Sequence, residues 1–271
     1  MLKGVQIIKM ELKDKYTVED LLAIIRRLRE PDGCPWDKVQ THQSIKKSLI
    51  EETYEAIDAL DFGSDRDFAN ELGDVLMQVA FHSVLAEERN AFDFDDVLKE
   101  VCDKLITRHT HVFGDDKAGN AEEALTNWEK NKKKEKSIET YTGVLRDVPK
   151  YLPSLMRAEK IQKKAKSFGF DWDNADDAYK KVEEECGEVM EAYREGDAAH
   201  IREEYGDLLF AVVNLGRFLG VDGETALAAA SEKFINRFER MENYAVEQGK
   251  DLAKMTLSEQ DDIWNKIKHK K

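Results

Sequence analysis

One acidic pattern occurs twice in this chain, at a constant offset of 133 residues. The shared positions are Glu51, Glu52, Glu55, Gly63, Glu71 and Asp74 in the first copy and Glu184, Glu185, Glu188, Gly196, Glu204 and Asp207 in the second. Since 56 of the 271 residues are acidic, five such acidic matches arise by chance roughly once in 3000 alignments. We therefore interpret the chain as a duplicated domain.

Two flanking matches extend the repeat on both sides of the acidic pattern. Upstream, Gly33-Cys-Pro-Trp36-Asp37 corresponds to Gly169-Phe-Asp-Trp172-Asp173. Downstream, Lys104-Leu-Ile-Thr-Arg108 corresponds to Lys233-Phe-Ile-Asn-Arg237. The junction falls near residues 137–148, so we predict an N-terminal domain over 1–136, a linker over 137–148 and a C-terminal domain over 149–271.

Helical spacing dominates the sequence between its few prolines. The four prolines form two pairs, Pro31 with Pro35 and Pro149 with Pro153, and no alternating β-branched segment bounded by turn residues lies between them. Thr17 starts a sequence like a capping box, with Asp20 in the place of the usual Glu. The predicted fold is all-α, two tandem helical bundles, with helices near 17–29, 42–61, 65–89, 94–108, 121–136, 153–166, 175–194, 198–219, 223–245 and 258–268.

Composition narrows the class of protein further. The net charge of −14 repels nucleic acid and anionic lipid, so a basic partner site would have to be local. No apolar stretch approaches the roughly 18 residues that a spanning helix needs, and the N-terminal sequence lacks the features of a secretory signal. Three widely spaced cysteines, Cys34, Cys102 and Cys186, argue against a disulfide framework or a structural zinc site. We expect a cytoplasmic protein.

The acidic residues of the second copy share helix faces. Glu185 and Glu188 form one stripe with Lys181, and Glu204 and Asp207 form another with Asn214. Gly196 lies eight residues from both Glu188 and Glu204, so an antiparallel turn there brings the four carboxylates to equal height. Apolar residues follow Asp207 directly, which predicts that this helix is buried. The first copy repeats the arrangement around Gly63, with Glu52, Glu55, Glu71 and Asp74.

Four carboxylates in an apolar setting take up protons unless a cation neutralises them. Oxygen ligands favour Mg²⁺, Mn²⁺ or Ca²⁺ over zinc. The simpler interpretation, without a metal, is that these carboxylates form ordinary ion pairs, with Lys181 as one partner. A ferritin-like di-iron site is excluded because no histidine stands three residues after a glutamate. An EF-hand at Asp171 is excluded because Asp176 and Val182 replace the turn glycine and the final glutamate.

Cationic and aromatic side chains accompany the second acidic set. Lys233 and Arg237 are spaced i, i+4, as are Trp264 and Lys268 in the C-terminal helix. Metal and cations for phosphates, with an aromatic plane for a base, suit a nucleoside polyphosphate. Taken singly, Lys233 and Arg237 are equally typical of a solvated helix face, and Trp264 of a packing role.

The pattern Glu-Glu-x-x-Glu, a turn, then Glu-x-x-Asp resembles the signature of the all-α nucleoside triphosphate pyrophosphohydrolases. The duplication, the Cys-Pro-Trp36-Asp37 loop and the Arg108-His-Thr-His-Val-Phe113 segment make the chain similar to the two-domain bacterial MazG family. The resemblance spans roughly residues 17–268. It implies Mg²⁺-dependent hydrolysis of NTPs or dNTPs to monophosphate and pyrophosphate, with Mn²⁺ a substitute, by a homodimer of helical bundles.

The resemblance also assigns roles to residues of the second copy. It implies metal ligands at Glu185, Glu188, Glu204 and Asp207, and substrate contacts at Lys181, Lys233, Arg237, Trp264 and Lys268 with Asn214 beside them. Glu184 and Glu185 are the candidate catalytic acids, Glu184 as an acid or base that orients water. His200 stands where relatives often carry Lys.

The two copies differ at two positions of the acidic stripes. Ser48 replaces Lys181 and Phe81 replaces Asn214, so a phosphate-binding ammonium and a polar group are missing from the first copy. We therefore predict that the second copy is the main catalytic unit, and that the first binds metal or nucleotide weakly or holds the dimer.

Two other functions stay open at this point. The basic runs 130–136 and 266–271 suit a non-catalytic protein that binds nucleotides, nucleic acid or an acidic partner, although such runs are usually solvated helix ends. An enzyme for one damaged nucleotide is a further alternative, because base selectivity depends on pocket shape.

Overall fold

A computed structural model describes residues 12–135 and 140–268 of the chain, and within these ranges the regular structure is entirely helical. The chain forms two compact units, Met1–Lys132 and Lys133–Lys271. This confirms the all-α prediction. No helix in the described ranges is long and apolar enough to cross a membrane.

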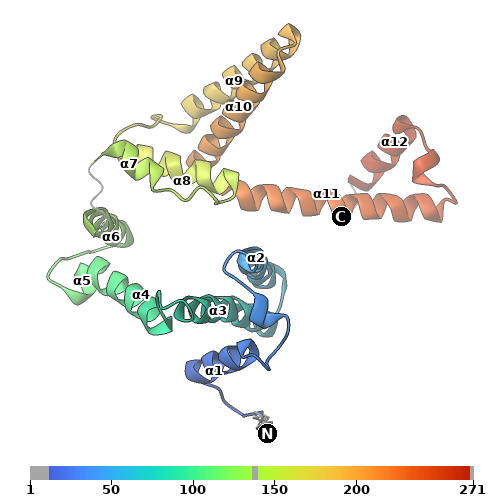
Figure 1. Cartoon of the computed structure of the whole chain (residues 1–271). Helices are drawn as coiled ribbons and strands as arrows, with labels where there is room; N and C mark the ends of the chain where they lie inside the picture. The colour runs from blue at the N-terminus through green and yellow to red at the C-terminus, as the bar shows by residue number, and fades with distance from the viewer. Residues whose placement is uncertain (1–11, 136–139, 269–271) are drawn as a thin grey trace, which may run out of the picture. The chain divides into compact units, whose positions relative to one another are not determined.

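Six α-helices and one short 3-10 helix make up the first unit and the segment that leaves it (Figure 1). They are α1 (Val18–Arg29), η1 (Asp37–Val39), α2 (Lys46–Phe62), α3 (Asp65–Glu87), α4 (Phe94–Arg108), α5 (Thr110–Phe113) and α6 (Ala121–Glu135). Helices α2 and α3 form a hairpin, and α1 packs on α3. The core lies between α1 and the second half of α3, around Ile25, Phe81 and Val84.

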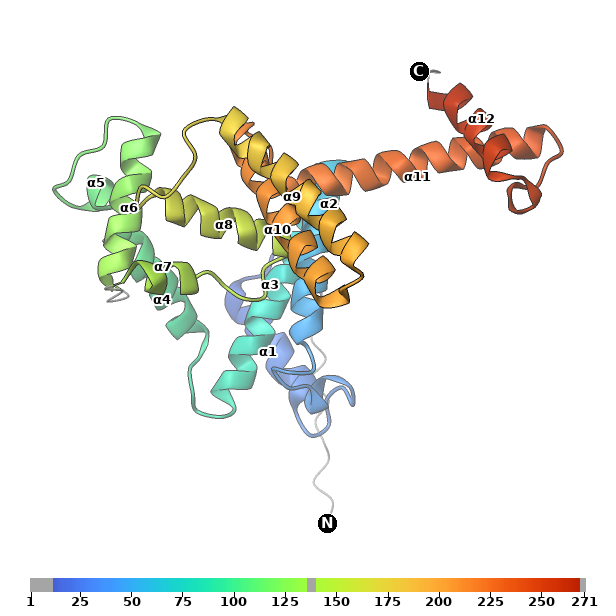
Figure 2. The ribbon, with the colours of Figure 1, turned by 90° about the horizontal axis from the view of Figure 1, so that it is seen from above.

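The second unit repeats this plan with six described helices and one 3-10 helix. They are α7 (Tyr141–Arg146), α8 (Ser154–Lys166), α9 (Ala175–Glu195), α10 (Ala198–Phe218), α11 (Gly223–Glu247), η2 (Leu252–Lys254) and α12 (Leu257–Lys268). Helices α9 and α10 form the hairpin, and α8 packs on α10 as α1 packs on α3. Figures 1 and 2 show α11 running away from the α9–α10 hairpin, with α12 folded back along its far end.

Local sequence explains where these helices begin. Thr17 accepts a hydrogen bond from the Asp20 amide while the Asp20 carboxylate accepts one from the Thr17 amide, so the predicted capping box is present. Asn174 caps α9 in a similar way, through the amide of Asp177. Within the interval expected to be a linker, 137–148, the described part holds α7, which packs on α8.

The expected burial of α10 is wrong for the single chain. Leu209, Phe210 and Val212 are 41–46% exposed, and in this helix only Ala211 and Val213 are buried. Most of the apolar surface that the sequence assigned to a core is therefore left uncovered by the unit itself.

Candidate active site

The α9–α10 hairpin turns where the sequence predicted, at Gly196. This glycine has φ 75°, the left-handed conformation that L side chains rarely adopt. Asp197 then caps α10 by accepting hydrogen bonds from the amides of Ala199 and His200. The close pairing of α9 and α10 sets the glutamates of the two helices opposite each other.

Three of the four predicted metal ligands converge between these helices. Each of Glu185, Glu188 and Glu204 offers a carboxylate oxygen within 4.8 Å of the others. Glu185 is 5% exposed, whereas the other two are partly exposed. Desolvation, followed by repulsion from Glu185, raises the pKa of Glu188 above its ordinary value. The site therefore concentrates negative charge where water screens it poorly.

Lys181 is the nearest cation to the buried carboxylate. Its Nζ lies 2.6 Å from Oε1 of Glu185 and 2.8 Å from Oε1 of Glu184. These hydrogen bonds, the one to Glu184 first, raise the pKa of Lys181, so the side chain stays an ammonium at neutral pH. Oε2 of Glu185, in contrast, is buried and accepts no hydrogen bond.

That unpartnered oxygen supports the interpretation as a metal site. A buried carboxylate oxygen without a donor is costly, and a hard divalent cation held by carboxylate oxygens would satisfy it. The donor set of oxygens alone, with no cysteine or histidine among its three members, is the set that Mg²⁺ or Mn²⁺ prefers. Both acidic clusters of the described chain can thus hold a divalent metal.

Asp207, the fourth predicted ligand, is not a member of this close cluster. It lines a cavity of about 500 Å³ together with Lys181, Glu185 and Asn214. Glu184, the other candidate catalytic acid, is held at the exposed side of α9 by Lys181. The structure therefore places five predicted side chains (Lys181, Glu184, Glu185, Asp207 and Asn214) around one region of the hairpin.

The remaining predicted substrate contacts lie elsewhere in the unit. On α11, Arg237 places its guanidinium 5.1 Å from the ring centroid of Trp264, which belongs to α12. Trp264 also contacts Phe234 and packs against the cluster around Met241 and Ile263. Lys233, Arg237, Trp264 and Lys268 are not among the cavity-lining residues. Within one unit, these four side chains therefore lie outside the cavity beside the carboxylates.

His200 sits between two glutamates at the start of α10. Its Nε2 lies 3.0 Å from Oε1 of Glu204, and its Nδ1 lies 3.2 Å from Oε2 of Glu195. The hydrogen bond with Glu195 is the largest cause that raises the pKa of His200. His200 is therefore in contact with a proposed ligand.

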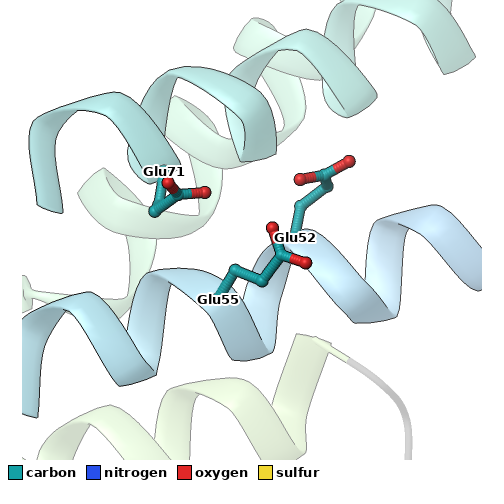
Figure 3. Close-up of side chains that lie close together, drawn as sticks. All are labelled: Glu52, Glu55 and Glu71. Carbon is teal, nitrogen blue, oxygen red and sulfur yellow. The ribbon is translucent and has the colours of Figure 1, made fainter. Parts of the chain in front are cut away.

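The first copy keeps a similar acidic cluster (Figure 3). Glu52 and Glu55 come from α2 and Glu71 from α3, with carboxylate oxygens within 4.8 Å of one another. Desolvation, followed by repulsion from Asp74, raises the pKa of Glu52. Gln78 donates to Glu52 from a distance of 3.5 Å.

Bulky side chains take the cavity positions in the first copy. By the repeat, Arg29 stands at the position of Ala165, Gln78 at that of Ala211 and Phe81 at that of Asn214. The Arg29 guanidinium lies over the Phe81 ring, 5.4 Å from its centroid, and also pairs with Glu88. The first copy therefore carries larger side chains than the second at these three positions.

Comparisons with known proteins agree with this geometry. A family model described as the MazG nucleotide pyrophosphohydrolase domain matches residues 40–113 and 175–241, one segment in each copy. A nucleoside triphosphate pyrophosphohydrolase of Escherichia coli K12 is 43% identical over 254 residues, which cover 93% of this chain and 97% of the relative.

This chain belongs to the MazG family. The MazG nucleoside triphosphate pyrophosphohydrolase/pyrophosphatase of Thermotoga maritima is 43% identical over 92% of this chain and 95% of its own length. An uncharacterised protein, YabN of Bacillus subtilis, is 44% identical over 91% of this chain but only 50% of its own length. The MazG resemblance seen in the sequence is thereby confirmed.

Sequence reasoning missed part of this MazG site. Arg217 donates to both carboxylate oxygens of Asp171 and to Oδ1 of Asn214, which fixes the loop after α8 against α10. Gln162 and Trp172 line the cavity. The matched Trp36 and Trp172 loops pointed to this region, but nothing in the sequence distinguished Gln162 from its lysine neighbours.

Proposed function

We propose that this chain hydrolyses nucleoside triphosphates, NTPs and dNTPs, to nucleoside monophosphate and pyrophosphate in a Mg²⁺-dependent reaction at the second copy. Water adds to the α-phosphorus, the bond from that phosphorus to the α–β bridging oxygen breaks, and pyrophosphate leaves. The names of the 43% identical relatives support the reaction. The observation that carries the assignment to the second copy is the buried, unpartnered Glu185 oxygen beside an open cavity.

In this proposal Glu185, Glu188, Glu204 and Asp207 hold the metal. Mg²⁺ held there would neutralise charge on the phosphates and make water a better nucleophile. Lys181 stays protonated and stabilises negative charge on the phosphates. Glu184, on the exposed side of Lys181, orients the attacking water or accepts its proton.

We further propose that the working form is a homodimer. Apolar side chains along α10 and α11 are exposed in the single chain, among them Val212, Phe234 and Phe238, and exposed apolar side chains of this kind are typical of an obligate interface. Covering it with a second copy would bring α11 and α12 of that copy toward the α9–α10 hairpin. Lys233, Arg237, Trp264 and Lys268 would then reach a bound nucleotide.

Light scattering of the purified chain tests the dimer. The chain mass is 31.2 kDa, so the proposal expects twice that mass at micromolar concentration. A mass of one chain would leave the four cationic and aromatic contacts without a route to the site.

Three unpaired cysteines suit the reducing cytoplasm, where we place the protein.

Product analysis of eight NTPs and dNTPs with Mg²⁺ tests the reaction. Monophosphate plus pyrophosphate, abolished by EDTA, is the expected result, and the panel also measures how broad the base preference is. Diphosphate plus phosphate would mean that a different bond is cut. Metal-independent, salt-sensitive nucleotide binding without turnover would instead favour the non-catalytic alternative.

A further inference from the structure

Arg217 joins two separate parts of the cavity wall in the second unit. It lies near the C-terminal end of α10, and its side chain is 7% exposed. Its guanidinium donates to both carboxylate oxygens of Asp171, in the loop between α8 and α9. It also donates to Oδ1 of Asn214, one turn earlier on α10, from Nε at 3.1 Å and from Nη2 at 2.7 Å. Asp171 and Asn214 line the cavity, whereas Arg217 is not among its lining residues.

These hydrogen bonds decide which way round the Asn214 amide is held. A guanidinium carries only donors, so the carboxamide oxygen faces it and the NH2 group does not. Two hydrogen bonds from Arg217 use both lone pairs of Oδ1. The NH2 group, which can only donate, is therefore the part of Asn214 that remains for a ligand in the cavity. Arg217 thus makes this position of the wall a hydrogen-bond donor.

The ion pair between Arg217 and Asp171 is not a requirement of the repeated fold. Its two side chains are 7% and 14% exposed, and desolvation offsets much of the attraction within a buried pair. The first copy does without this pair, because Val84 and Pro35 stand at the two corresponding positions. Val84 packs in the apolar core of that copy. The second copy therefore keeps a polar arrangement where an apolar one suffices for folding, which points to a role in the site.

An arginine also anchors the corresponding segment in the first copy, but it comes from another helix. Arg29 of α1 donates to the backbone carbonyl oxygens of Asp37 and Gln40. Its guanidinium then lies over the ring of Phe81, the residue at the position of Asn214, 5.4 Å from the ring centroid. Anchoring of this segment is thus common to both copies. What distinguishes the second copy is that the anchoring arginine also orients an amide in the cavity wall.

We propose that Arg217 is a positioning residue of the site, which holds Asn214 so that its NH2 group donates to an acceptor atom of the bound nucleotide. The inference rests on the proposed function, since it deepens the same site. Asn214 lies seven residues beyond Asp207 on α10, which is about 10 Å along the helix axis. Because of this separation from the metal ligands, the contact stabilises bound substrate and not the scissile bond.

A double-mutant cycle in the full chain tests whether Arg217 acts through Asn214. Arg217→Lys keeps the positive charge beside Asp171 but loses the planar fork that reaches both partners. In titration calorimetry with AMP, we expect Arg217→Lys to weaken binding about fivefold and Asn214→Ala about tenfold. The double variant should bind AMP as Asn214→Ala alone does. The matched control Arg202→Lys, at an exposed position of α10, should bind AMP as wild type does.

Steady-state kinetics with ATP separate this inference from the proposed function. Arg217→Lys should raise KM about fivefold and leave kcat within about twofold of wild type, because the lost interaction holds substrate and transition state equally. Coupled losses of AMP affinity without any hydrolysis would refute the proposed function but support the role of Arg217. Losses that multiply in the double variant, or an AMP affinity unchanged in Arg217→Lys, would overturn that role even if ATP is hydrolysed.

Discussion

Replacing Lys181 by methionine removes the cation that faces the buried carboxylate of Glu185. The Nζ–Oε1 distance is 2.6 Å, and the two side chains are 33% and 6% exposed. Breaking a fully buried ion pair costs about 3–5 kcal/mol, whereas an exposed pair contributes about 0–1 kcal/mol. Because water reaches a third of the lysine, we expect an intermediate loss of about 2 kcal/mol in local stability.

Amide hydrogen exchange of the α9–α10 hairpin, followed by mass spectrometry, measures this loss in the full chain. A change of about 2 kcal/mol accelerates exchange roughly thirtyfold when opening is at equilibrium. Lys180→Met is the matched control, since Lys180 is 70% exposed and pairs with Asp177. The control should leave hydrogen exchange of the hairpin almost unchanged, because water screens this exposed pair.

Divalent metal should shrink the effect of Lys181→Met. A cation held by Glu185 neutralises the same charge that the lysine neutralises in its absence. The acceleration of exchange should therefore be large in EDTA and several-fold smaller in saturating Mg²⁺. Equal acceleration under both conditions, or exchange no faster than in the Lys180→Met control, would refute the reasoning that connects Lys181, Glu185 and the metal.

Three other predictions concern backbone, cavity and pH. Gly196→Ala should lower the free energy of unfolding, measured in urea, by about 1 kcal/mol, because Gly196 has a φ of 75°. An unchanged midpoint of the urea transition would contradict this. Ala211→Gln should lower kcat/KM about tenfold by entering the cavity, without a lower melting temperature; unchanged kinetics would count against the cavity. Burial lowers the pKa values of His42 and His82 from 6.5, so the unfolded chain binds more protons than the folded chain. At pH values below about 6.5, the thermal stability of the first unit should therefore decrease as the pH falls, and it should decrease less steeply in His82→Gln.

The histidine prediction has a defined structural origin. Arg89 donates to Nε2 of His42 over 3.0 Å, and the two Nδ1 atoms lie 2.8 Å apart. With Nε2 of His42 accepting, its Nδ1 carries the proton and donates to His82. Burial is the main cause that lowers both pKa values, followed by repulsion from Arg89 for His42 and from His42 for His82.

Helix positions could be predicted closely because the signals are local. The α9 and α10 helices begin at residues 175 and 198 as expected, since Asn174 and Asp197 are capping residues and Gly196 ends a helix. The short helices α5 and α7 were not predicted, because four and six residues carry too little periodicity.

The candidate site was only partly accessible from the sequence. Spacing along two helices and a turn brought Glu185, Glu188 and Glu204 together, since hairpin geometry is nearly fixed. The cavity could not be foreseen, because Gln162 reaches it through the packing of α8 on α10. Exposure of Val212 on α10 was also not predicted, since an apolar face does not reveal whether its own domain or another chain covers it.

Turnover of two isosteric variants tests the central claim most directly. Glu185→Gln and Glu52→Gln each remove one charge from an acidic cluster, one in each copy, without changing side-chain size. With ATP and Mg²⁺, the account predicts that Glu185→Gln loses at least about a hundredfold in kcat/KM, while Glu52→Gln stays within about threefold of wild type. Equal losses in the two variants, or a larger loss in Glu52→Gln, would contradict the assignment of catalysis to the second copy.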